Sequence, residues 1–332
     1  MNRLFWVAAL CVIVGCSKAG DQGAPQAKNA NAGATKKRQI AVIAKEASHD
    51  FWKSVHAGAE RAAKELGNVE ILWKAPTRGD DPNEQINIVQ NFITLGVDGI
   101  CLAPIDSRSL VDVVRSAKSA GIPTVIIDSG LEDPSATVSF VATDNKNGGS
   151  LAARELGKRL NGQGNVILLR YNPGSESTEQ RELGFLETIQ KEFPDIRLIS
   201  SDQYAGADES SALDKSQQLL LKFGKDVNGI FAVNESCATG MLRAIDEADL
   251  TKKVVYIGFD SSDRLVHALG DGKIQGLVLQ DPVNMAYLGV KTVCESLDGK
   301  PVESRVATGE HVATLENMND PEIRKLLYPE KF

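Results

Sequence analysis

Polar and aromatic side chains recur in this sequence just after short apolar runs, and their chemistry is that of a binding site. The first apolar run, 40–44, leads to His49, Phe51 and Trp52. Later runs lead to a carboxylate, an amide or a guanidinium, namely Asp128, Arg181, Asn234, Asp260 and Gln280. Such planar groups each make two directed hydrogen bonds, and aromatic faces offer apolar contact to C–H groups. Together they suit a small, uncharged, hydroxyl-rich molecule such as a monosaccharide or a related polyol.

Each of these residues also has a structural interpretation. His49 either donates to a ligand hydroxyl or caps the helix that follows it. Of Phe51 and Trp52, one ring stacks on a ligand, or both fasten that helix to the core. Asn145 and Asn234 are each plausible helix caps when taken alone. The recurrence of such residues after so many apolar runs is what favours a shared site.

The elements that position these side chains follow a repeated pattern. The segment 39–66 has the form of a buried strand, a polar loop and an amphipathic helix that Gly67 ends. Apolar runs begin near residues 40, 69, 99 and 123, and again near 166, 196, 229 and 254, with amphipathic stretches between them. Strands that alternate with helices in this way predict parallel sheets, with ligands at the carboxyl ends of the strands. The two sets predict two α/β domains.

The last part of the chain predicts how these domains are joined. It contains one more strand at 273–279, a helix at 285–297 and short β-like segments at 302–308 and 311–315. These elements are too few for a third domain, so they complete the first two. The chain therefore crosses between the domains more than once, which is typical of a hinge.

The amino terminus has the form of an export signal. Asn2-Arg3 precedes the apolar run 4–14, which is shorter than the ~20 residues that a bilayer span requires. An ordinary secretory peptide is one interpretation. Residues 13–16, Ile-Val-Gly-Cys, also resemble the lipobox of bacterial lipoproteins, and that resemblance implies cleavage after residue 15 and a diacylglycerol on Cys16. Residues 16–38 are polar and poor in apolar side chains, so they are interpreted as a disordered tether.

Composition and motifs argue against other classes of protein. The net charge is −7 without a basic face, which argues against nucleic-acid binding. Cys101, Cys237 and Cys294 are too widely spaced for a disulfide framework or a metal site, and His49 and His56 have no third ligand nearby. Asp128 and Asp260 could form an acid–base pair across a cleft, but no nucleophile motif, phosphate loop or zinc motif accompanies them. We therefore expect that the protein is not an enzyme and that it binds no metal and no cofactor.

Residues 39–315 resemble the periplasmic sugar-binding proteins of the ribose/galactose type, the solute receptors of ABC importers. The resemblance rests on an ordered set of motifs: Asp50-Phe51-Trp52, Gly121 to Asp128, Thr143-Asp144-Asn145, Arg181 with Gly184-Phe185, Asn234-Glu235, Gly258-Phe259-Asp260 and Gln280-Asp281-Pro282.

This resemblance implies an α/β fold of the type I periplasmic binding protein, with two similar doubly wound parallel-sheet (Rossmann-like) domains and a multi-strand hinge. It implies an N-terminal lobe of 39–142 plus 281–309 and a C-terminal lobe of 143–280 plus 310–332. It also implies that Phe51 and Trp52 stack on a sugar, while the hydroxyls bond to Asp128, Arg181, Asn234, Asp260 and Gln280.

As partners, the resemblance implies a small-molecule sugar and the membrane permease of an importer. The expected protein is a monomer on the periplasmic side of the cell envelope, held by its lipid. A sensory protein that presents its sugar-bound form to a membrane kinase or chemoreceptor would use the same pocket. A repressor shares the two-domain body but requires an amino-terminal helix-turn-helix, where this chain has an export signal.

The chain departs from the ribose-binding pattern at three places. His49 stands where an asparagine is expected, and Ser129 where an arginine is expected. The aromatic residue expected near 204–208 has no clean match, because Tyr204 is offset and Ala207-Asp208 occupy the aligned place. These departures imply a modified pocket.

Overall fold

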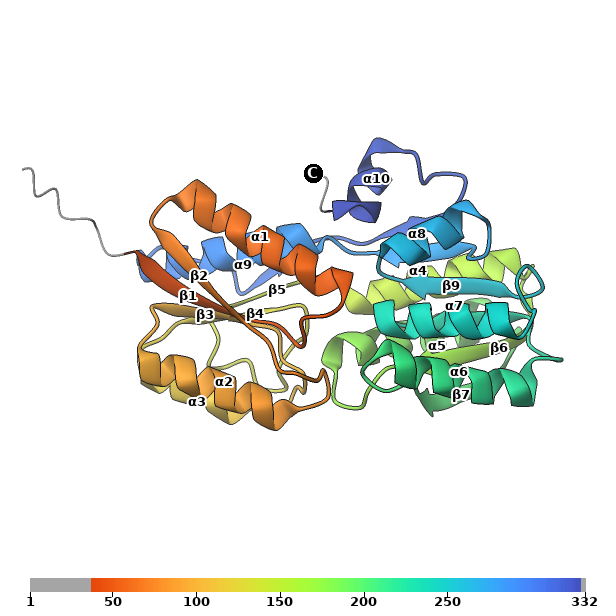
Figure 1. The fold of residues 1–332 in the computed structure, drawn as a ribbon, viewed down its shortest axis with the longest axis horizontal. Coiled ribbons are helices and arrows are strands. Elements are labelled where there is room, and N and C mark those ends of the chain that lie inside the picture. The colour runs from red at the N-terminus through yellow and green to blue at the C-terminus, as the bar shows by residue number, and fades with distance from the viewer. Residues whose placement is uncertain (1–36, 330–332) are drawn as a thin grey trace, which may run out of the picture. The chain divides into compact units, whose positions relative to one another are not determined.

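The computed structural model describes residues 37–329 of the chain, which form two six-stranded sheets with helices packed around them (Figure 1). The strands of the first sheet are all parallel to their neighbours. Their order is β11 (Arg305–Ala307), β5 (Ser139–Ala142), β4 (Thr124–Ile127), β3 (Gly99–Leu102), β1 (Arg38–Ile43) and β2 (Val69–Lys74).

The second sheet repeats this build with one difference at its edge. Its order is β12 (His311–Ala313), β10 (Gly276–Leu279), β9 (Val255–Phe259), β8 (Gly229–Ala232), β6 (Gln163–Arg170) and β7 (Asp195–Tyr204). β12 runs antiparallel to β10, whereas the other pairs are parallel. The predicted pair of doubly wound α/β domains is confirmed, with an antiparallel edge strand that the repeat pattern did not indicate.

The helices of the first lobe cover both faces of its sheet. Alternate residues of β1 face opposite ways, so Ile40 and Val42 join one core cluster and Ala41 and Ile43 join the other. The first cluster contains residues of α1 (Asp50–Leu66) and α9 (Pro282–Leu297), and the second contains residues of α2 (Pro82–Leu95) and α3 (Val111–Ser119). Figure 1 shows these pairs on opposite sides of the strands.

The second lobe has a single continuous core. Its helices are α4 (Asn145–Arg159), α5 (Glu176–Glu192), α6 (Glu209–Phe223), α7 (Glu235–Glu247), α8 (Asp263–Gly270) and α10 (Pro321–Leu327). α4 packs against α5, and α6 packs against α7. The α4–α5 contact is very close, because a Cβ on Gly149 would lie 1.9 Å from the carbonyl oxygen of Arg181. Glycine is needed there so that α5 can lie close to α4.

The chain passes between the two sheets at three places in the described range. It leaves the first sheet after β5, returns to the first lobe as α9 after β10, and crosses again between β11 and β12. These connections form the predicted multi-strand hinge. Among the described residues, no helix combines the length and the apolar character that a membrane span requires.

The amino-terminal predictions mostly lie outside the described residues. These are the signal peptide 1–15, the lipidated Cys16 and the tether as far as residue 36. The first strand begins at Arg38, two residues before the apolar run 40–44, and Arg38 forms an ion pair with Asp298 at 2.7 Å.

Candidate functional site

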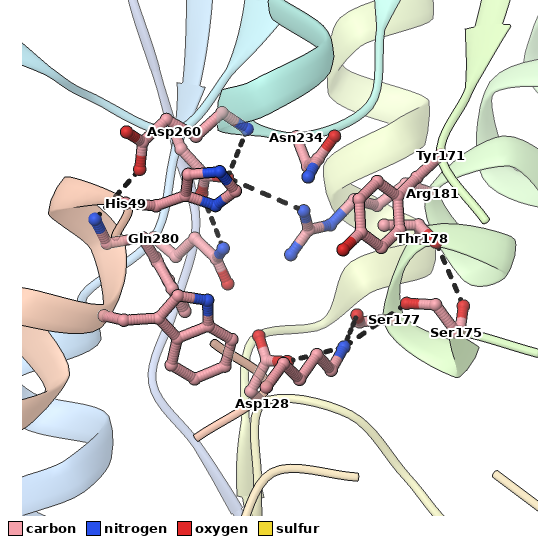
Figure 2. Close-up of a pocket in the computed structure, with 14 residues that line it drawn as sticks. His49, Asp128, Tyr171, Ser175, Ser177, Thr178, Arg181, Asn234, Asp260 and Gln280 are labelled. Carbon is pink, nitrogen blue, oxygen red and sulfur yellow. Dashed lines mark hydrogen bonds and ion pairs between the residues drawn. The ribbon is translucent and has the colours of Figure 1, made fainter. Parts of the chain in front are cut away.

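A pocket lies where the carboxyl ends of strands from both sheets meet, and fourteen residues line it (Figure 2). It holds about 390 Å³ of space free of protein atoms, part of it open to solvent. All the ligand-contact residues expected from the sequence line it: His49, Phe51, Trp52, Asp128, Arg181, Asn234, Asp260 and Gln280. The structure therefore brings together residues that are more than 200 positions apart in the chain.

Two aspartates occupy equivalent positions in the two lobes. Asp128 follows β4 and Asp260 follows β9, and both have a left-handed backbone, with φ of 64° and 70°. Few residues other than glycine adopt this conformation, and such positions concentrate at functional sites. Each also donates its backbone N–H to the next strand, Asp128 to Val141 and Asp260 to Val278. The ends of the strands are thereby held so that both carboxylates line the pocket.

Arg181 is held by contacts on several sides. It is 2% exposed, its Nε donates to Asn145 Oδ1 at 2.8 Å, and its Nη1 donates to the Val233 carbonyl at 3.0 Å. The guanidinium carbon lies 3.8 Å from the centre of the Phe259 ring, and Nη1 lies 3.9 Å from Asp260 Oδ2. Burial lowers the pKa of Arg181, while the Asp260 carboxylate opposes that shift. The guanidinium is thus fixed in direction before any ligand arrives.

Gln280 and Asp260 form a second polar group at the pocket. Gln280 Nε2 donates to Asp260 Oδ1 at 2.6 Å, and the backbone N–H of Glu235 donates to Asp260 Oδ2 at 3.0 Å. Gln280 Oε1 is buried and has no hydrogen-bond partner among the described residues. A buried acceptor without a donor is unfavourable, so this oxygen is suited to accept from a ligand hydroxyl.

The aromatic pair at the start of α1 belongs to both the core and the pocket. Phe51 is 8% exposed and Trp52 is 5% exposed, and their rings meet edge to face at 4.8 Å between centroids. Both join the first core cluster, and both line the pocket. The two interpretations of these residues are therefore compatible, because the same rings that fasten α1 also present an apolar surface to the pocket.

His49 occupies the N-cap position of α1, but its side chain makes no capping bond. Its Nδ1 instead lies 2.8 Å from Glu46 Oε1. Burial opposes a charge on either group, yet the bond between them lowers the pKa of Glu46 to about 2 and raises the pKa of His49. The pair therefore holds the loop after β1 in place while His49 lines the pocket.

This pair predicts a specific pH dependence of stability. The contribution of Glu46 to the free energy of unfolding is fully present above pH 4.5, the usual pKa of glutamate, and is lost as the pH falls towards 2. The contribution of His49 to the free energy of unfolding is fully present below pH 6.5 and is lost as the pH rises through the raised pKa of His49. Replacing His49 with glutamine should therefore destabilise the protein most between about pH 4.5 and 6.5. Urea unfolding at pH 3, 5.5 and 9 measures this, with the exposed His267→Gln as control. An effect that does not vary with pH would contradict the role of the pair.

The charged groups at the pocket balance one another. Lys45 lies 2.9 Å from Asp128, Arg181 faces Asp260, and His49 is paired with Glu46. The remaining carboxylate, Glu235, accepts from the backbone N–H groups of Asp50 and Phe51, and burial raises its pKa to about 7, against the attraction of His49. A charged ligand would disturb these pairs, whereas an uncharged ligand can use their remaining lone pairs and protons.

Six lining residues are not among the ligand contacts that the sequence predicts, namely Lys45, Tyr171, Ser175, Ser177, Thr178 and Glu235. Lys45 belongs to the loop after the first strand, and Glu235 stands in the Asn234-Glu235 motif, so the sequence indicated the neighbourhood of both residues. The others lie in or just after the loop that follows β6. Tyr171 is 5% exposed in the pocket, whereas Tyr204, whose ring lies 5.6 Å from the guanidinium of Arg170, does not line it. Tyr171 thus supplies a further aromatic ring at this site.

The asparagines differ in role. Asn234 caps α7, because its Oδ1 accepts from the Cys237 N–H at 3.4 Å, and it also lines the pocket. Asn145 is not the cap of α4, since Asp144 has that role, and Asn145 instead orients Arg181. In the described part of the chain, no group of three or more His, Cys, Asp or Glu side chains is arranged to hold a metal ion.

Comparison with known proteins gives a consistent result. The model of the periplasmic binding protein domain family matches residues 40–301. The ribose import binding protein of Bacillus subtilis (strain 168) is 28% identical over 299 residues, which cover 90% of this chain and 93% of the relative.

Solved structures are similar over most of the chain. One is a carbohydrate transporter solute-binding protein from Agrobacterium radiobacter in complex with D-arabinose, 34% identical with a TM-score of 0.84, covering 88% of this chain and 99% of the other. Another is an ABC transporter solute-binding protein from Agrobacterium vitis with bound D-fucose, also 34% identical with a TM-score of 0.84, covering 87% and 100%.

Proposed function

Because the chain belongs to the periplasmic binding protein domain family, we propose that it is the solute-binding component of an ABC importer for a monosaccharide or related polyol. The family is one of substrate-binding proteins of the periplasm, not of enzymes, and this locates the chain outside the cytoplasm. The ligand lies in the pocket between the lobes, and the membrane permease of the importer is the partner that receives it.

The observation that carries this proposal is the charge-balanced pocket at the converging strand ends. It combines paired charges, the unpartnered oxygen of Gln280 and the aromatic faces of Trp52 and Tyr171. Paired charges disfavour an ionic ligand, and directed polar groups beside apolar ring faces match the hydroxyls and C–H groups of a sugar. The sugars bound in the similar solved structures support this ligand class.

Binding in such a pocket requires the lobes to separate and close around the ligand. We assign 39–142 with 281–309 to one lobe and 143–280 with 310–332 to the other. The order of strands in the two sheets supports this division, with β11 in the first sheet and β12 in the second. Closure about the three connections brings both sets of strand ends onto the ligand, and the protein acts as a monomer.

A thermal-shift screen of the purified protein tests this function. Pentoses, hexoses and inositols are compared with amino acids and sugar phosphates of similar size. At least one uncharged polyol should raise the melting temperature in a saturable way, because a ligand that binds only the folded state stabilises it. Stabilisation by charged compounds alone would contradict the proposal.

Replacing Trp52 with alanine should weaken sugar binding more than it weakens the fold. The indole lines the pocket, and its loss removes an apolar face from the site, so we expect the affinity for the sugar to fall by at least tenfold. Titration calorimetry measures the affinity, and thermal unfolding without ligand measures the fold. Trp73→Ala is the matched control, because Trp73 packs on His56 and does not line the pocket. A collapse in melting temperature with unchanged affinity of the folded fraction would place Trp52 in the core alone.

The lipid anchor is proposed from the sequence around Cys16. Cleavage before Cys16 and acylation of its thiol would tether the protein to a membrane through residues 17–38. A Cys16→Ser variant should then move from the membrane fraction to the soluble periplasmic fraction and lose incorporation of a labelled fatty acid. Equal incorporation into the variant and the parent would contradict lipidation at this residue.

A further inference from the structure

A lysine after the first strand reaches across the pocket to the other lobe. The side chain of Lys45 is 6% exposed, and its ammonium lies 2.9 Å from Asp128 Oδ2 in its own lobe. The same ammonium donates to Ser175 Oγ at 3.3 Å and to Ser177 Oγ at 3.2 Å in the second lobe. Figure 2 shows Asp128, Ser175 and Ser177 together at one end of the pocket.

These contacts occupy the whole donor capacity of the side chain. An ammonium has three N–H bonds, and Lys45 has three acceptors within hydrogen-bond distance. No donor is left for a ligand, although Lys45 lines the pocket. The nearby carboxylate offsets the cost of burying the charge, and it stays with Lys45 however the lobes move. The two serine bonds, in contrast, exist only when the lobes are together.

Other bonds join the lobes at the same end. The backbone N–H of Ser177 donates to Ser129 Oγ at 3.0 Å, and the backbone N–H of Gly130 donates to Glu176 Oε2 at 2.8 Å. Ser129 and Gly130 follow Asp128 directly, so this whole turn of the first lobe is seated on the first turn of α5. Lys45 is the charged member of this contact and approaches it from a different strand.

We infer that Lys45 is a latch between the lobes, a positioning residue that stabilises the closed arrangement through Ser175 and Ser177 without touching the ligand. It therefore slows the release of every ligand to the same extent and does not choose between ligands. The inference rests on the proposed hinge closure but is independent of which molecule binds.

The most informative variant removes the two serine hydroxyls that accept from Lys45 and leaves the buried ion pair of Lys45 with Asp128 intact. Ser175 makes no side-chain capping bond, and alanine is well tolerated at the position of Ser177 inside α5, so the Ser175→Ala/Ser177→Ala protein should fold normally. The matched control is Ser116→Ala/Ser119→Ala, since those exposed hydroxyls bond only to carbonyls of their own helix. Lys45→Met removes the same two bonds from the other side of the cleft.

The distance between the lobes is measured without ligand in the full-length protein. Dyes on cysteines introduced at the exposed Leu95 and Leu221 report it by single-molecule energy transfer. The ratio of closed to open molecules should fall about tenfold in both latch variants and stay unchanged in the control. With two ligands from the screen, dissociation should accelerate about tenfold for each, and the ratio of their affinities should stay within about twofold.

Two results would overturn the inference. A closed fraction equal to that of the control in both latch variants would show that Lys45 does not hold the lobes together. A changed preference between the two ligands would show that Lys45 recognises the ligand directly. Because the ligand-free measurement needs no sugar, failure of the proposed function would be seen separately, as an absence of binders in the screen.

Discussion

Replacing Arg181 with alanine should lower the affinity for the sugar by roughly 2–5 kcal/mol of binding free energy, the largest effect we expect from a single substitution. The guanidinium is buried, stacked on Phe259 and directed by Asn145, and it is the cation nearest to Asp260. Without it the buried carboxylate of Asp260 keeps only the neutral donors of Gln280 and of the Glu235 backbone N–H, and burial already raises the pKa of that group. Titration calorimetry with the strongest binder from the thermal-shift screen gives the affinity.

The control for this substitution is Arg154→Ala. Arg154 is half-exposed on α4 and pairs with Glu192 at 2.8 Å, so its loss should change the affinity by less than twofold. Arg181→Lys should be intermediate, because lysine keeps the charge but cannot reproduce the planar contacts to Asn145 and the Val233 carbonyl. A loss of less than tenfold for Arg181→Ala would argue against the assigned pocket.

Replacing Asp128 with alanine should have an effect of similar size, about 2–5 kcal/mol on binding. It removes a hydrogen-bond acceptor from the pocket and leaves the Lys45 ammonium without its carboxylate partner. It also places alanine in a left-handed backbone, at φ 64°, which costs roughly 1 kcal/mol in folding stability.

Asp128→Asn separates the backbone effect from the loss of charge. Asparagine tolerates the left-handed conformation but still leaves the Lys45 ammonium without its carboxylate partner, so the melting temperature should fall less than in Asp128→Ala while the affinity still falls. The exposed Asp112→Ala serves as control. If Asp128→Asn bound the sugar within tenfold of the parent, the charge of this carboxylate would not be part of recognition.

Much of the fold could be predicted because its elements follow simple periodicities. The apolar run that begins near residue 123 predicts a strand, and β4 lies there at Thr124–Ile127; the end of α1 at Gly67, which has φ 74°, is also predicted. The β-like segment expected at 311–315 contains β12, but its antiparallel direction and the short helices α8 and α10 were not predicted. Each of these elements is short and depends on the lobe it packs against more than on its own sequence pattern.

The grouping of the site residues could be predicted for a related reason. The carboxyl ends of parallel strands share one edge of a sheet, so residues such as Asp260 and Gln280 are neighbours in any fold of this class. The same argument gives no orientation for loop residues. Tyr171 lies in the pocket and Tyr204 outside it, although each ends or follows a strand. The left-handed backbone of the two aspartates, and the reach of Lys45 into the other lobe, depend on three-dimensional contacts that no spacing reveals.

The most direct test is a crystal structure of the protein with its strongest binder from the screen. An uncharged polyol should lie between the lobes beside Trp52, with its hydroxyls bonded to Asp128, Arg181 and Gln280. Density for that ligand on an outer surface of either lobe, with the pocket between the strand ends filled only by water, would contradict the account.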